Sequence, residues 1–335
     1  MKTLIEFSTL GILALILALI FIPFIKQIAV KVNLVDKPNY RKVHTNAVPL
    51  IGGISIAITV LIVLIVSGNQ LSLLKEYLPI LSSGFVLLIV GVIDDKTDLS
   101  AKYKLVIQLL LAFIIALSGT RITTFYGFLG VYEIATWSQY ILTIIVITGV
   151  VNAFNLMDGV DGLVGGLSLL GFTMFLVSSI FYNDYFLGKV SVIFIGAIIG
   201  FLKFNLSKKK IFMGDAGSLF LGFILVTFGI HFMEEQHSTN NYGYAYGFLI
   251  LVAFFSIPVL DSIRVYVGRI KQGNSPFKAD KSHLHHLLLT AGLTHKKISL
   301  FVVIFCMILF FFFFFLISFI STTLIILAIM TLFLA

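Results

Sequence analysis

The chain has 335 residues, of which 59% are hydrophobic and only 11% are charged. A soluble domain with a hydrated surface does not have this composition, so lipid is the solvent for most of the chain. The single cysteine, Cys306, excludes an intrachain disulfide. The net charge of +8 would suggest nucleic acid in a soluble protein. In a membrane protein, basic cytoplasmic loops explain it, so no nucleic-acid partner is expected.

Long apolar segments follow one another along the whole chain. A spanning helix needs about 20 apolar residues, and eleven segments are candidates, several of them short. The first follows Lys2, as in a signal peptide, but it is long and no small-residue cleavage site follows it, so we expect a span. The sequence predicts an all-α polytopic membrane protein with about 11 transmembrane helices, in a single domain over residues 1–335. The segments are 4–25, 50–67, 77–93, 104–118, 139–153, 162–182, 188–204, 216–232, 243–260, 298–316 and 320–335.

Lysine and arginine are distributed unevenly among the connections between these segments. Loops 26–48, 94–104, 203–215 and 261–298 contain 19 of the 23 basic residues. Because basic loops stay on the cytoplasmic side, we expect these four loops and the connection 153–162 to be cytoplasmic. The N-terminus is then outside and the C-terminus cytoplasmic.

The acidic residues sort by type as well as by side. All nine on the predicted cytoplasmic side are aspartates, whereas five of the six on the other side are glutamates. The positive-inside rule says little about carboxylates, so the aspartates need another explanation, and metal and phosphate chemistry supplies one. The nine are Asp36, Asp94, Asp95, Asp98, Asp158, Asp161, Asp215, Asp261 and Asp280.

The first motif is the aspartate cluster Asp94-Asp95-Lys96-Thr97-Asp98 at the end of the third segment. Carboxylates at a membrane boundary are costly unless they are solvated or paired. A divalent cation would relieve their repulsion, and Lys102 and Lys104 could do part of this. A solvated helix end is the alternative interpretation.

The second motif runs from Asn152 to Gly166, between the fifth and sixth segments. It contains Asn155, Asp158 and Asp161 among several glycines. Amide and carboxylate oxygens suit Mg²⁺, and glycines let the backbone approach a ligand closely. Close helix packing in the membrane would also explain the glycines, but it does not explain the three polar residues.

The third motif, Phe212-Met213-Gly214-Asp215-Ala216-Gly217-Ser218, follows the basic run Lys208–Lys210 and opens the eighth segment. Asp215 can be read as a simple helix N-cap. Alternatively, it lies beside a helix N-terminus whose backbone N–H groups and dipole favour phosphate.

The fourth motif joins Asp261 and Arg264 to His283-Leu284-His285-His286. Three clustered histidines could form a transition-metal site such as zinc, part of a surface helix, or a set of donors for a diphosphate or sugar. Zinc is less favoured because the nearby acids are aspartates and Cys306 is distant. His44 and His295 are expected to be ordinary surface residues.

Together the four motifs resemble the polyprenyl-phosphate N-acetylhexosamine-1-phosphate transferases of glycosyltransferase family 4, which include the phospho-N-acetylmuramoyl-pentapeptide translocases. The resemblance covers nearly the whole chain, from Asp36-Lys37-Pro38 and Arg41-Lys42-x-His44 to the histidine motif. His283-Leu284-His285-His286 favours the UDP-GlcNAc branch, because the translocase carries three consecutive histidines. Residues 261–264 and 275–278 also resemble that branch.

The resemblance implies that undecaprenyl phosphate attacks the sugar-bearing phosphorus of a UDP-sugar, with GlcNAc as the expected sugar, and that UMP is released. This would be the first membrane step of a cell-envelope glycan such as lipopolysaccharide or teichoic acid. The expected cofactor is Mg²⁺, with Mn²⁺ as the alternative ion. The expected location is the bacterial cytoplasmic membrane with the site facing the cytoplasm, and a homodimer is left open.

The resemblance also implies residue roles by motif position. The metal ligands would be Asn155 and Asp215. The catalytic residues would be Asp94 and Asp95, beside the lipid phosphate, and Asp158. The residues that neutralise phosphate charge or grip the sugar nucleotide would be Lys102, Lys104, Asp161, Arg264, His283, His285 and His286.

The charge of a phosphate monoester predicts the kind of attack. Its second pKa is about 6, so the lipid phosphate is mostly a dianion at neutral pH and hardly needs a strong base. We therefore expect direct in-line attack, with Asp94 assisting by orientation or as a weak base, rather than a covalent aspartyl-phosphate intermediate.

Other functions fit the sequence less well. A transporter would place charges near the bilayer midplane, whereas these carboxylates lie at the ends of segments. A transferase acting on other prenyl diphosphates or CDP-alcohols does not predict the histidine motif or the Phe212–Asp215 segment. A pentapeptide-translocase activity or another UDP-HexNAc donor is left open.

Overall fold

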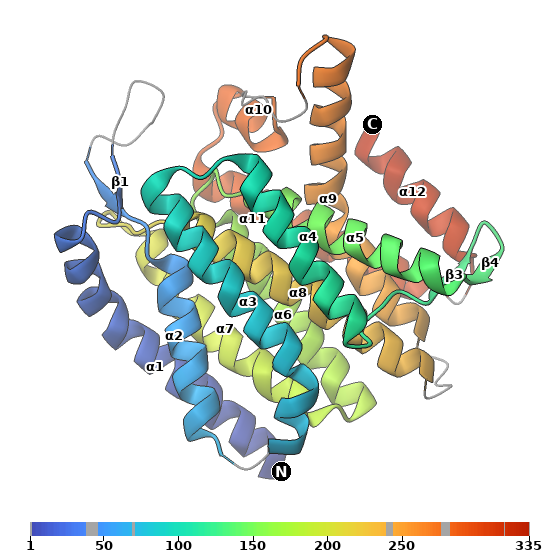
Figure 1. Ribbon diagram of the computed structural model, residues 1–335, viewed down its shortest axis with the longest axis horizontal. Coiled ribbons are helices and arrows are strands. Elements are labelled where there is room, and N and C mark those ends of the chain that lie inside the picture. Colours follow the sequence, from blue (N-terminus) through green and yellow to red (C-terminus); the bar gives the residue numbers. More distant parts are fainter. Residues whose placement is uncertain are drawn as a thin grey trace. The chain divides into compact units, whose positions relative to one another are not determined.

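The structure is a computed structural model that describes residues 2–37, 46–68, 71–238, 244–275, 282–317 and 319–334. This part of the chain forms twelve helices and four short strands (Figure 1). In chain order they are α1 (Lys2–Lys31), β1 (Val35–Asp36), β2 (Val48–Pro49), α2 (Gly52–Val66), α3 (Leu71–Thr97), α4 (Ala101–Leu117), β3 (Thr124–Phe128), β4 (Val131–Glu133), α5 (Thr136–Leu156), α6 (Leu163–Tyr182), α7 (Tyr185–Asn205), α8 (Gly214–Ser238), α9 (Tyr244–Lys271), α10 (Leu284–Thr290), α11 (His295–Leu316) and α12 (Thr322–Leu334).

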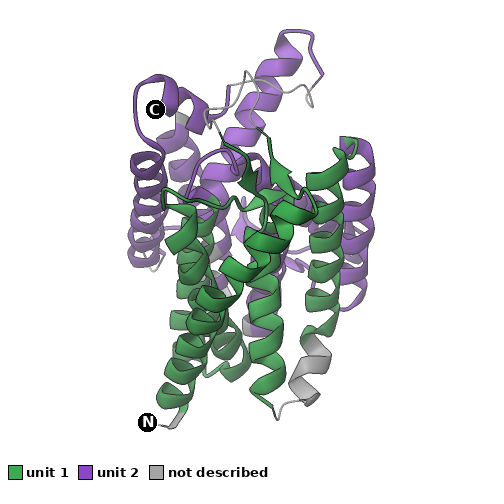
Figure 2. Ribbon diagram, turned by 90° about the vertical axis from the view of Figure 1, so that its left-hand side faces the viewer, with its two compact units in different colours: residues 1–100, 164–221 green, residues 101–163, 222–335 purple. Residues whose placement is uncertain are grey.

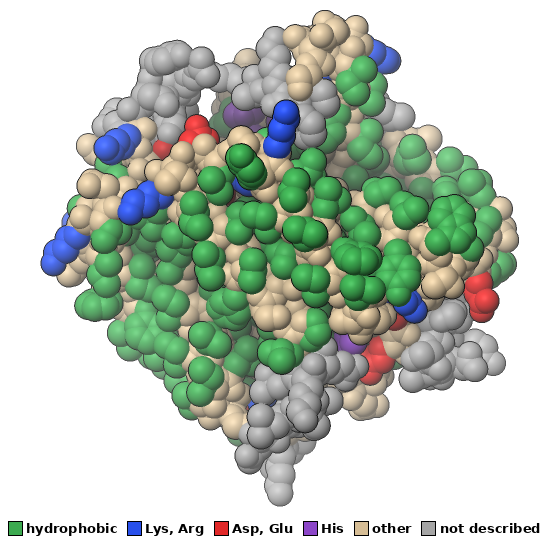
Figure 3. All heavy atoms as spheres, viewed as in Figure 1, with side chains coloured by type: hydrophobic (Ala, Val, Ile, Leu, Met, Phe, Trp, Pro, Cys, Tyr) green, Lys and Arg blue, Asp and Glu red, His purple; other side chains and the backbone are tan. Residues whose placement is uncertain are grey.

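Each of the eleven predicted apolar segments corresponds to a helix. Within the described residues, eight helices are long and apolar enough to cross a membrane, namely α1, α3, α5, α6, α7, α8, α9 and α11. Helices α2 and α12 are apolar but shorter, and α4 has 17 residues. Large hydrophobic side chains are exposed along the helices and dominate the surface drawn in Figure 3. The all-α membrane architecture is confirmed, whereas the count of 11 spans and their orientation stay predictions.

The chain divides into two compact units, each assembled from two separate stretches of sequence (Figure 2). Unit 1 comprises residues 1–100 and 164–221, and unit 2 comprises residues 101–163 and 222–335. Helix α8 therefore begins in unit 1 and ends in unit 2. The first and third sequence motifs lie in unit 1, whereas the fourth motif and the second motif up to Leu163 lie in unit 2.

Small residues let α1 and α7 pack closely in unit 1. Ala14 and Ala18 of α1 are completely buried, and Gly196 and Gly200 of α7 lie against them with too little space for a Cβ atom. In lipid, the hydrophobic effect does little to drive apolar helices together. Van der Waals packing between closely approaching backbones supplies the attraction instead. Helix α2 packs on both α1 and α7.

Backbone contacts fix the start of α8 against α2 and α3 in unit 1. The N–H of Phe212 donates to the Pro49 carbonyl at 2.9 Å, and the N–H of Gly52 donates to the Phe212 carbonyl at 2.9 Å. Gly91 of α3 lies directly against the backbone of Ala216. A side chain at Gly91 would have to displace the backbone of α8, so the position of this helix start depends on glycine.

In unit 2, α9 packs against α5, α11 and α12. The antiparallel hairpin β3–β4 is tied to the last helix, because the Thr322 hydroxyl donates to the Tyr126 carbonyl at 2.8 Å. A buried hydrophobic cluster joins α11 to α12 and consists of Leu309, Phe313, Ile325 and Ile329.

Pro258 lies inside α9 and leaves one helical carbonyl without its usual donor, because proline has no N–H to give to the residue four positions earlier. That residue is Phe254, and the buried thiol of Cys306 on α11 donates to its carbonyl at 3.9 Å. An unsatisfied carbonyl is expensive in lipid, and neighbouring helices commonly supply the missing donor. The single cysteine therefore has a structural role.

The helices extend beyond the predicted apolar segments at their charged ends. Helix α1 continues to Lys31, α3 to Thr97 and α9 to Lys271. Long basic side chains reach water from a helix end, so charge marks a membrane boundary rather than the end of a helix. The two small sheets were not predicted, because strands of two to five residues are too short to show an apolar alternation.

Gly91→Ala is expected to destabilise the protein, because the added methyl group would collide with the Ala216 backbone. Overpacking of this kind typically costs about 1–3 kcal/mol. Gly149→Ala in α5 is the matched control, since nothing lies within 4 Å of its Cβ position. Thermal unfolding in detergent should show a lower midpoint for Gly91→Ala alone. Equal midpoints for the two variants would contradict the close approach of α3 to α8.

Candidate active site

Asp94 lies in the last turns of α3 and closes the end of that helix. Its side chain is buried, and its Oδ1 accepts the Leu99 N–H at 2.7 Å. The Asp98 N–H donates to the Asp94 carbonyl at 2.9 Å, and Asp98 has a positive φ of 56°. Aspartate tolerates this conformation better than most residues. The aspartate cluster is therefore a shaped helix end with fixed carboxylate positions.

Asp95, the next residue, caps the N-terminus of α8. Its Oδ1 accepts the Asp215 N–H at 2.8 Å, and its Oδ2 accepts the Ala216 N–H at 3.2 Å. The first N–H groups of a helix have no partner within the helix, and the positive end of the helix dipole favours a carboxylate. Gly214, at φ +72°, leaves room for Asp95, because a Cβ there would lie 2.5 Å from Oδ2. The first and third sequence motifs thus meet in unit 1.

Asp215 lies at a helix N-terminus, as both interpretations of the sequence expected. The N–H groups of Asp215 and Ala216 are capped by Asp95. Asp95 is 120 residues away from Asp215 in the sequence. Local sequence could not show this, because a carboxylate from another helix supplies the cap.

The donors at this helix start fit Mg²⁺ chemically. Asp215 lies in the first turn of α8, immediately beside the Asp95 carboxylate. Carboxylate oxygens are hard ligands, and Mg²⁺ usually takes only one or two of them together with water and substrate phosphates. Among the described residues, no three His, Cys, Asp or Glu side chains are grouped to hold a metal. This holds for His283, His285 and His286 of the fourth motif as well.

The second motif forms a tight loop between α5 and α6 in unit 2. The Asp158 N–H donates to the Asn155 carbonyl at 3.1 Å, and Gly162 has a φ of +82° just before α6 begins. Asn155, Asp158 and Asp161 are half-buried. The loop therefore holds all three polar side chains close to the end of α5. The metal-ligand role of Asn155 stays a prediction.

Lys102 and Lys104 lie in the first turn of α4, in the same unit. Lys102 is exposed and Lys104 is half-buried. One turn further along, the buried Gln108 side chain accepts a 2.5 Å hydrogen bond from Asn152 Nδ2 of α5. This bond sets the register of α4 against α5. It thereby fixes the position of Lys102 and Lys104 relative to the second motif.

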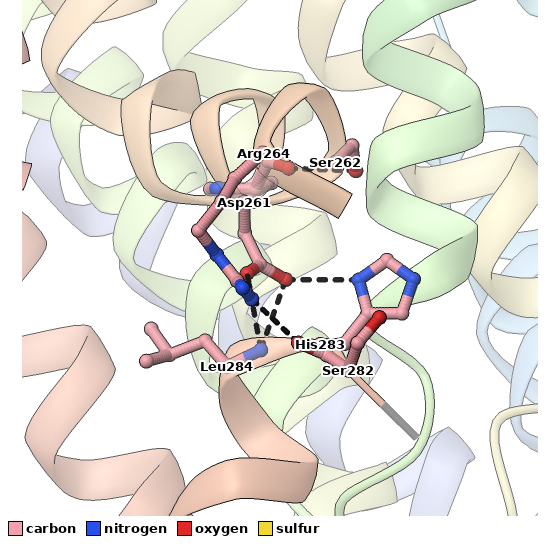
Figure 4. A network of polar contacts seen from close by, with 7 residues as sticks. Asp261, Ser262, Arg264, Ser282, His283 and Leu284 are labelled. Carbon is pink, nitrogen blue, oxygen red and sulfur yellow. Dashed lines mark hydrogen bonds and ion pairs between the residues drawn. The ribbon is translucent and has the colours of Figure 1, made fainter. Parts of the chain in front are cut away.

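The fourth motif is organised by Asp261 of α9, as Figure 4 shows. Its carboxylate contacts Arg264 Nη2 at 2.7 Å and His283 Nδ1 at 2.9 Å. Arg264 Nη2 also donates to the Ser282 carbonyl at 2.6 Å. The sequence indicated Asp261 as the start of the motif but no role for it, because two of its partners, His283 and Leu284, lie 22 and 23 residues away.

The second and fourth motifs also meet in unit 2. A Cβ on Gly159 would lie 2.5 Å from His285 Nε2, so the buried His285 ring stands directly against the glycine loop. The Asp161 N–H donates to His295 Nδ1 at 3.2 Å. The expectation that His295 is an ordinary surface residue is therefore wrong. No local motif marked it, since Asp161 is 134 residues away.

His285 carries no charge at neutral pH. Burial, reinforced by the neighbouring His286 and His283, lowers the pKa of His285 to about 3. It can therefore offer hydrogen bonding to a ligand but not positive charge. Of the two roles that the resemblance implies for His285, gripping the sugar nucleotide therefore fits better than neutralising charge, and that role stays a prediction.

Parts of the predicted site lie outside the described residues. These are His44 with the preceding Arg41 and Lys42, and Asp280 before the histidine motif. The structure brings Asp94, Asp95 and Asp215 together in unit 1. In unit 2 it brings the glycine loop to His285 and His295, and Arg264 and His283 to Asp261.

Acid should destabilise the protein partly through His285. The unfolded chain protonates this histidine near pH 6.5, whereas the folded protein does so only near pH 3. Unfolding therefore takes up a proton in this range, and stability falls by up to about 1.4 kcal/mol for each pH unit below about 6.5. His285→Asn should show a smaller drop in unfolding midpoint between pH 7.5 and 5.5. Identical pH dependence in the two proteins would show that His285 is not held neutral.

Comparison with known proteins gives one family. The sequence profile of glycosyl transferase family 4 matches residues 77–233. A probable undecaprenyl-phosphate N-acetylglucosaminyl 1-phosphate transferase of Bacillus subtilis (strain 168) is 34% identical over 293 residues, which cover 87% of this chain and 79% of the relative. The undecaprenyl-phosphate alpha-N-acetylglucosaminyl 1-phosphate transferase of Yersinia pestis is 30% identical, over 90% and 82% of the two chains. The Escherichia coli (strain K12) enzyme of the same name is 30% identical, over 85% and 77%.

These relatives match over most of their own length, and the profile match contains the first, second and third sequence motifs. The chain therefore belongs to the polyprenyl-phosphate N-acetylhexosamine-1-phosphate transferases of glycosyltransferase family 4, in the branch of the undecaprenyl-phosphate N-acetylglucosaminyl 1-phosphate transferases.

Proposed function

We propose that this protein transfers GlcNAc-1-phosphate from UDP-GlcNAc to undecaprenyl phosphate and releases UMP. The reaction would take place at the cytoplasmic face of the bacterial cytoplasmic membrane, as the first membrane step of a cell-envelope glycan. The observation that carries the proposal is the bond between Asp95 and the start of α8, which joins the aspartate cluster to Asp215. The names of the relatives support the donor and the acceptor.

The main physical obstacle to this reaction is charge. The lipid phosphate is mostly a dianion at neutral pH, and it must approach a diphosphate that is also anionic. Mg²⁺, for which Asp215 is a predicted ligand, would neutralise the diphosphate and polarise the phosphorus that is attacked. Lys102, Lys104 and Arg264 add fixed positive charge, and preorganised charge of this kind is usually the largest contribution to catalysis.

The protein's carboxylates then orient the reactants. Asp94 and Asp95 are held by backbone N–H groups at 2.7 and 2.8 Å, so neither side chain has to be ordered when substrate binds. We assign them a place beside the lipid phosphate, where Asp94 orients the attacking oxygen or takes a proton as a weak base. Asp158 and Asp161 would contact the nucleoside of the donor or organise the metal site.

The test is an assay of purified protein with undecaprenyl phosphate, Mg²⁺ and a panel of UDP-sugars, with Mn²⁺ in a parallel series. UMP should be released with UDP-GlcNAc. Asp215→Asn should abolish turnover by removing a metal ligand, and Asp95→Asn should do so because an amide presents an N–H to one of the two donors of α8. Both variants should still insert into membranes.

Asp184→Asn is the matched control for Asp95→Asn. Asp184 also caps a helix, since its Oδ1 accepts the Leu187 N–H at 2.9 Å at the start of α7. The control should keep near-normal turnover. No UMP with any sugar from folded protein would count against the function, and normal turnover by Asp215→Asn would remove that residue from the site.

Direct attack predicts that the protein is never labelled by the donor. UDP-GlcNAc carrying ³²P in its β-phosphate should leave no label on the protein when lipid is omitted, and no stoichiometric burst of UMP should appear. When undecaprenyl phosphate is added, the label should pass into the lipid product. A labelled aspartate formed before lipid is added would establish a covalent intermediate instead.

A further inference from the structure

Asp261 is buried completely, yet its position on α9 is held by charged and polar partners. A buried carboxylate is costly unless donors surround it. Its Oδ1 accepts from Arg264 Nη2 at 2.7 Å and from the Leu284 N–H at 3.0 Å. Its Oδ2 lies 2.9 Å from His283 Nδ1 and 3.2 Å from the Leu284 N–H. Both oxygens are thus engaged by the chain itself, and Asp261 is not placed to contact substrate.

The bond to Asp261 determines which nitrogen of His283 is protonated. A carboxylate can only accept, so Nδ1 of His283 carries a proton and donates it to Oδ2. The other ring nitrogen, Nε2, is buried and has no hydrogen-bond partner among the described residues. Buried polar atoms nearly always have a partner, and an exception needs an explanation. A ligand atom that reaches Nε2 would provide one.

Asp261 also fixes the helix that follows. The Leu284 N–H that it accepts belongs to the first residue of α10, and His283 is the N-cap position of that helix without a side-chain cap of its own. Arg264 adds a second connection, through the Ser282 carbonyl. Figure 4 shows Arg264, His283 and the Leu284 N–H around the Asp261 carboxylate. One side chain of α9 therefore sets both the orientation of His283 and the start of the helix that carries His285 and His286.

We propose that Asp261 is a positioning residue for the transfer reaction, which holds the His283 ring so that Nε2 faces an anionic phosphate oxygen of the substrate. The proposal rests on the proposed function. A carboxylate bonded to one ring nitrogen fixes the orientation of a histidine, and a protonated Nε2 held in this way would donate a charge-assisted hydrogen bond to such an oxygen. Asp261 therefore acts on the substrate only through His283.

The first experiment is a double-mutant cycle with Asp261→Asn and His283→Gln. Asp261→Asn keeps the shape of the side chain and should lower kcat by about 10–100-fold, as loss of an outer partner of a functional histidine does. In the His283→Gln background, the same change should alter kcat by less than about 3-fold, because the residue through which Asp261 acts is gone. The KM values for UDP-GlcNAc and for undecaprenyl phosphate, measured separately, show which phosphate meets Nε2.

Asp184→Asn is again the matched control, since it removes the charge of an aspartate that caps a helix by accepting the Leu187 N–H. It should leave kcat unchanged, and unfolding midpoints in detergent should be compared for all variants. If Asp261→Asn lowers kcat by the same factor with and without His283, or if its activity falls only in proportion to the loss of folded protein, the proposal is overturned and Asp261 is a structural cap.

A second measurement does not depend on turnover. The ¹⁵N chemical shifts of labelled histidine distinguish protonated from unprotonated ring nitrogens, and the His283 signals are identified by their loss in His283→Gln. Wild-type protein should show a protonated Nδ1 at His283. An unprotonated Nδ1 would overturn the proposal even if Asp261→Asn fails to fold. If wild-type protein releases no UMP, the proposed function fails, but this experiment still decides whether Asp261 sets the protonation of His283.

Discussion

In both units, a carboxylate on one helix accepts the backbone N–H groups that open another helix. Asp95 of α3 does this for α8, and Asp261 of α9 does it for α10. Water cannot satisfy the N–H donors of helix starts that are buried or lie in lipid, so the acceptors must come from the protein. Each carboxylate in turn needs those donors, because it has left water itself. The hydrogen bonds between them offset the cost of burying both groups. In unit 1 they also bring residues of different motifs together.

This arrangement ties the chemistry of the protein to its folding. Asp95 lies beside the predicted metal ligand Asp215, and Asp261 lies beside the predicted substrate-binding His283. Replacing either carboxylate removes both a cap and a neighbour of a functional group. Activity and stability are therefore expected to change together at these positions, and only coupled measurements separate the two contributions.

The sequence predicts the helices well because lipid demands long apolar segments, and each of the eleven segments is helical. The sequence did not predict the two small sheets. The predicted segments also end several helices too early, at their charged residues. Motif order identifies the family and most candidate site residues. The pairings within the site could not be predicted, because Asp95 meets Asp215 across 120 residues and Asp161 meets His295 across 134. Such contacts arise from helix packing, which no local pattern records.

The bond from Cys306 to the Phe254 carbonyl has a practical consequence for experiments on this protein. The only thiol of the chain is buried and engaged beside Pro258, so aqueous thiol reagents should find no background target in the native state. Single cysteines can then be introduced at exposed positions and labelled one at a time from either side of a sealed vesicle. Examples are Lys102 at the start of α4 and Trp137 at the start of α5. The natural protein can therefore be used without removing its own cysteine to map which helix ends face the cytoplasm.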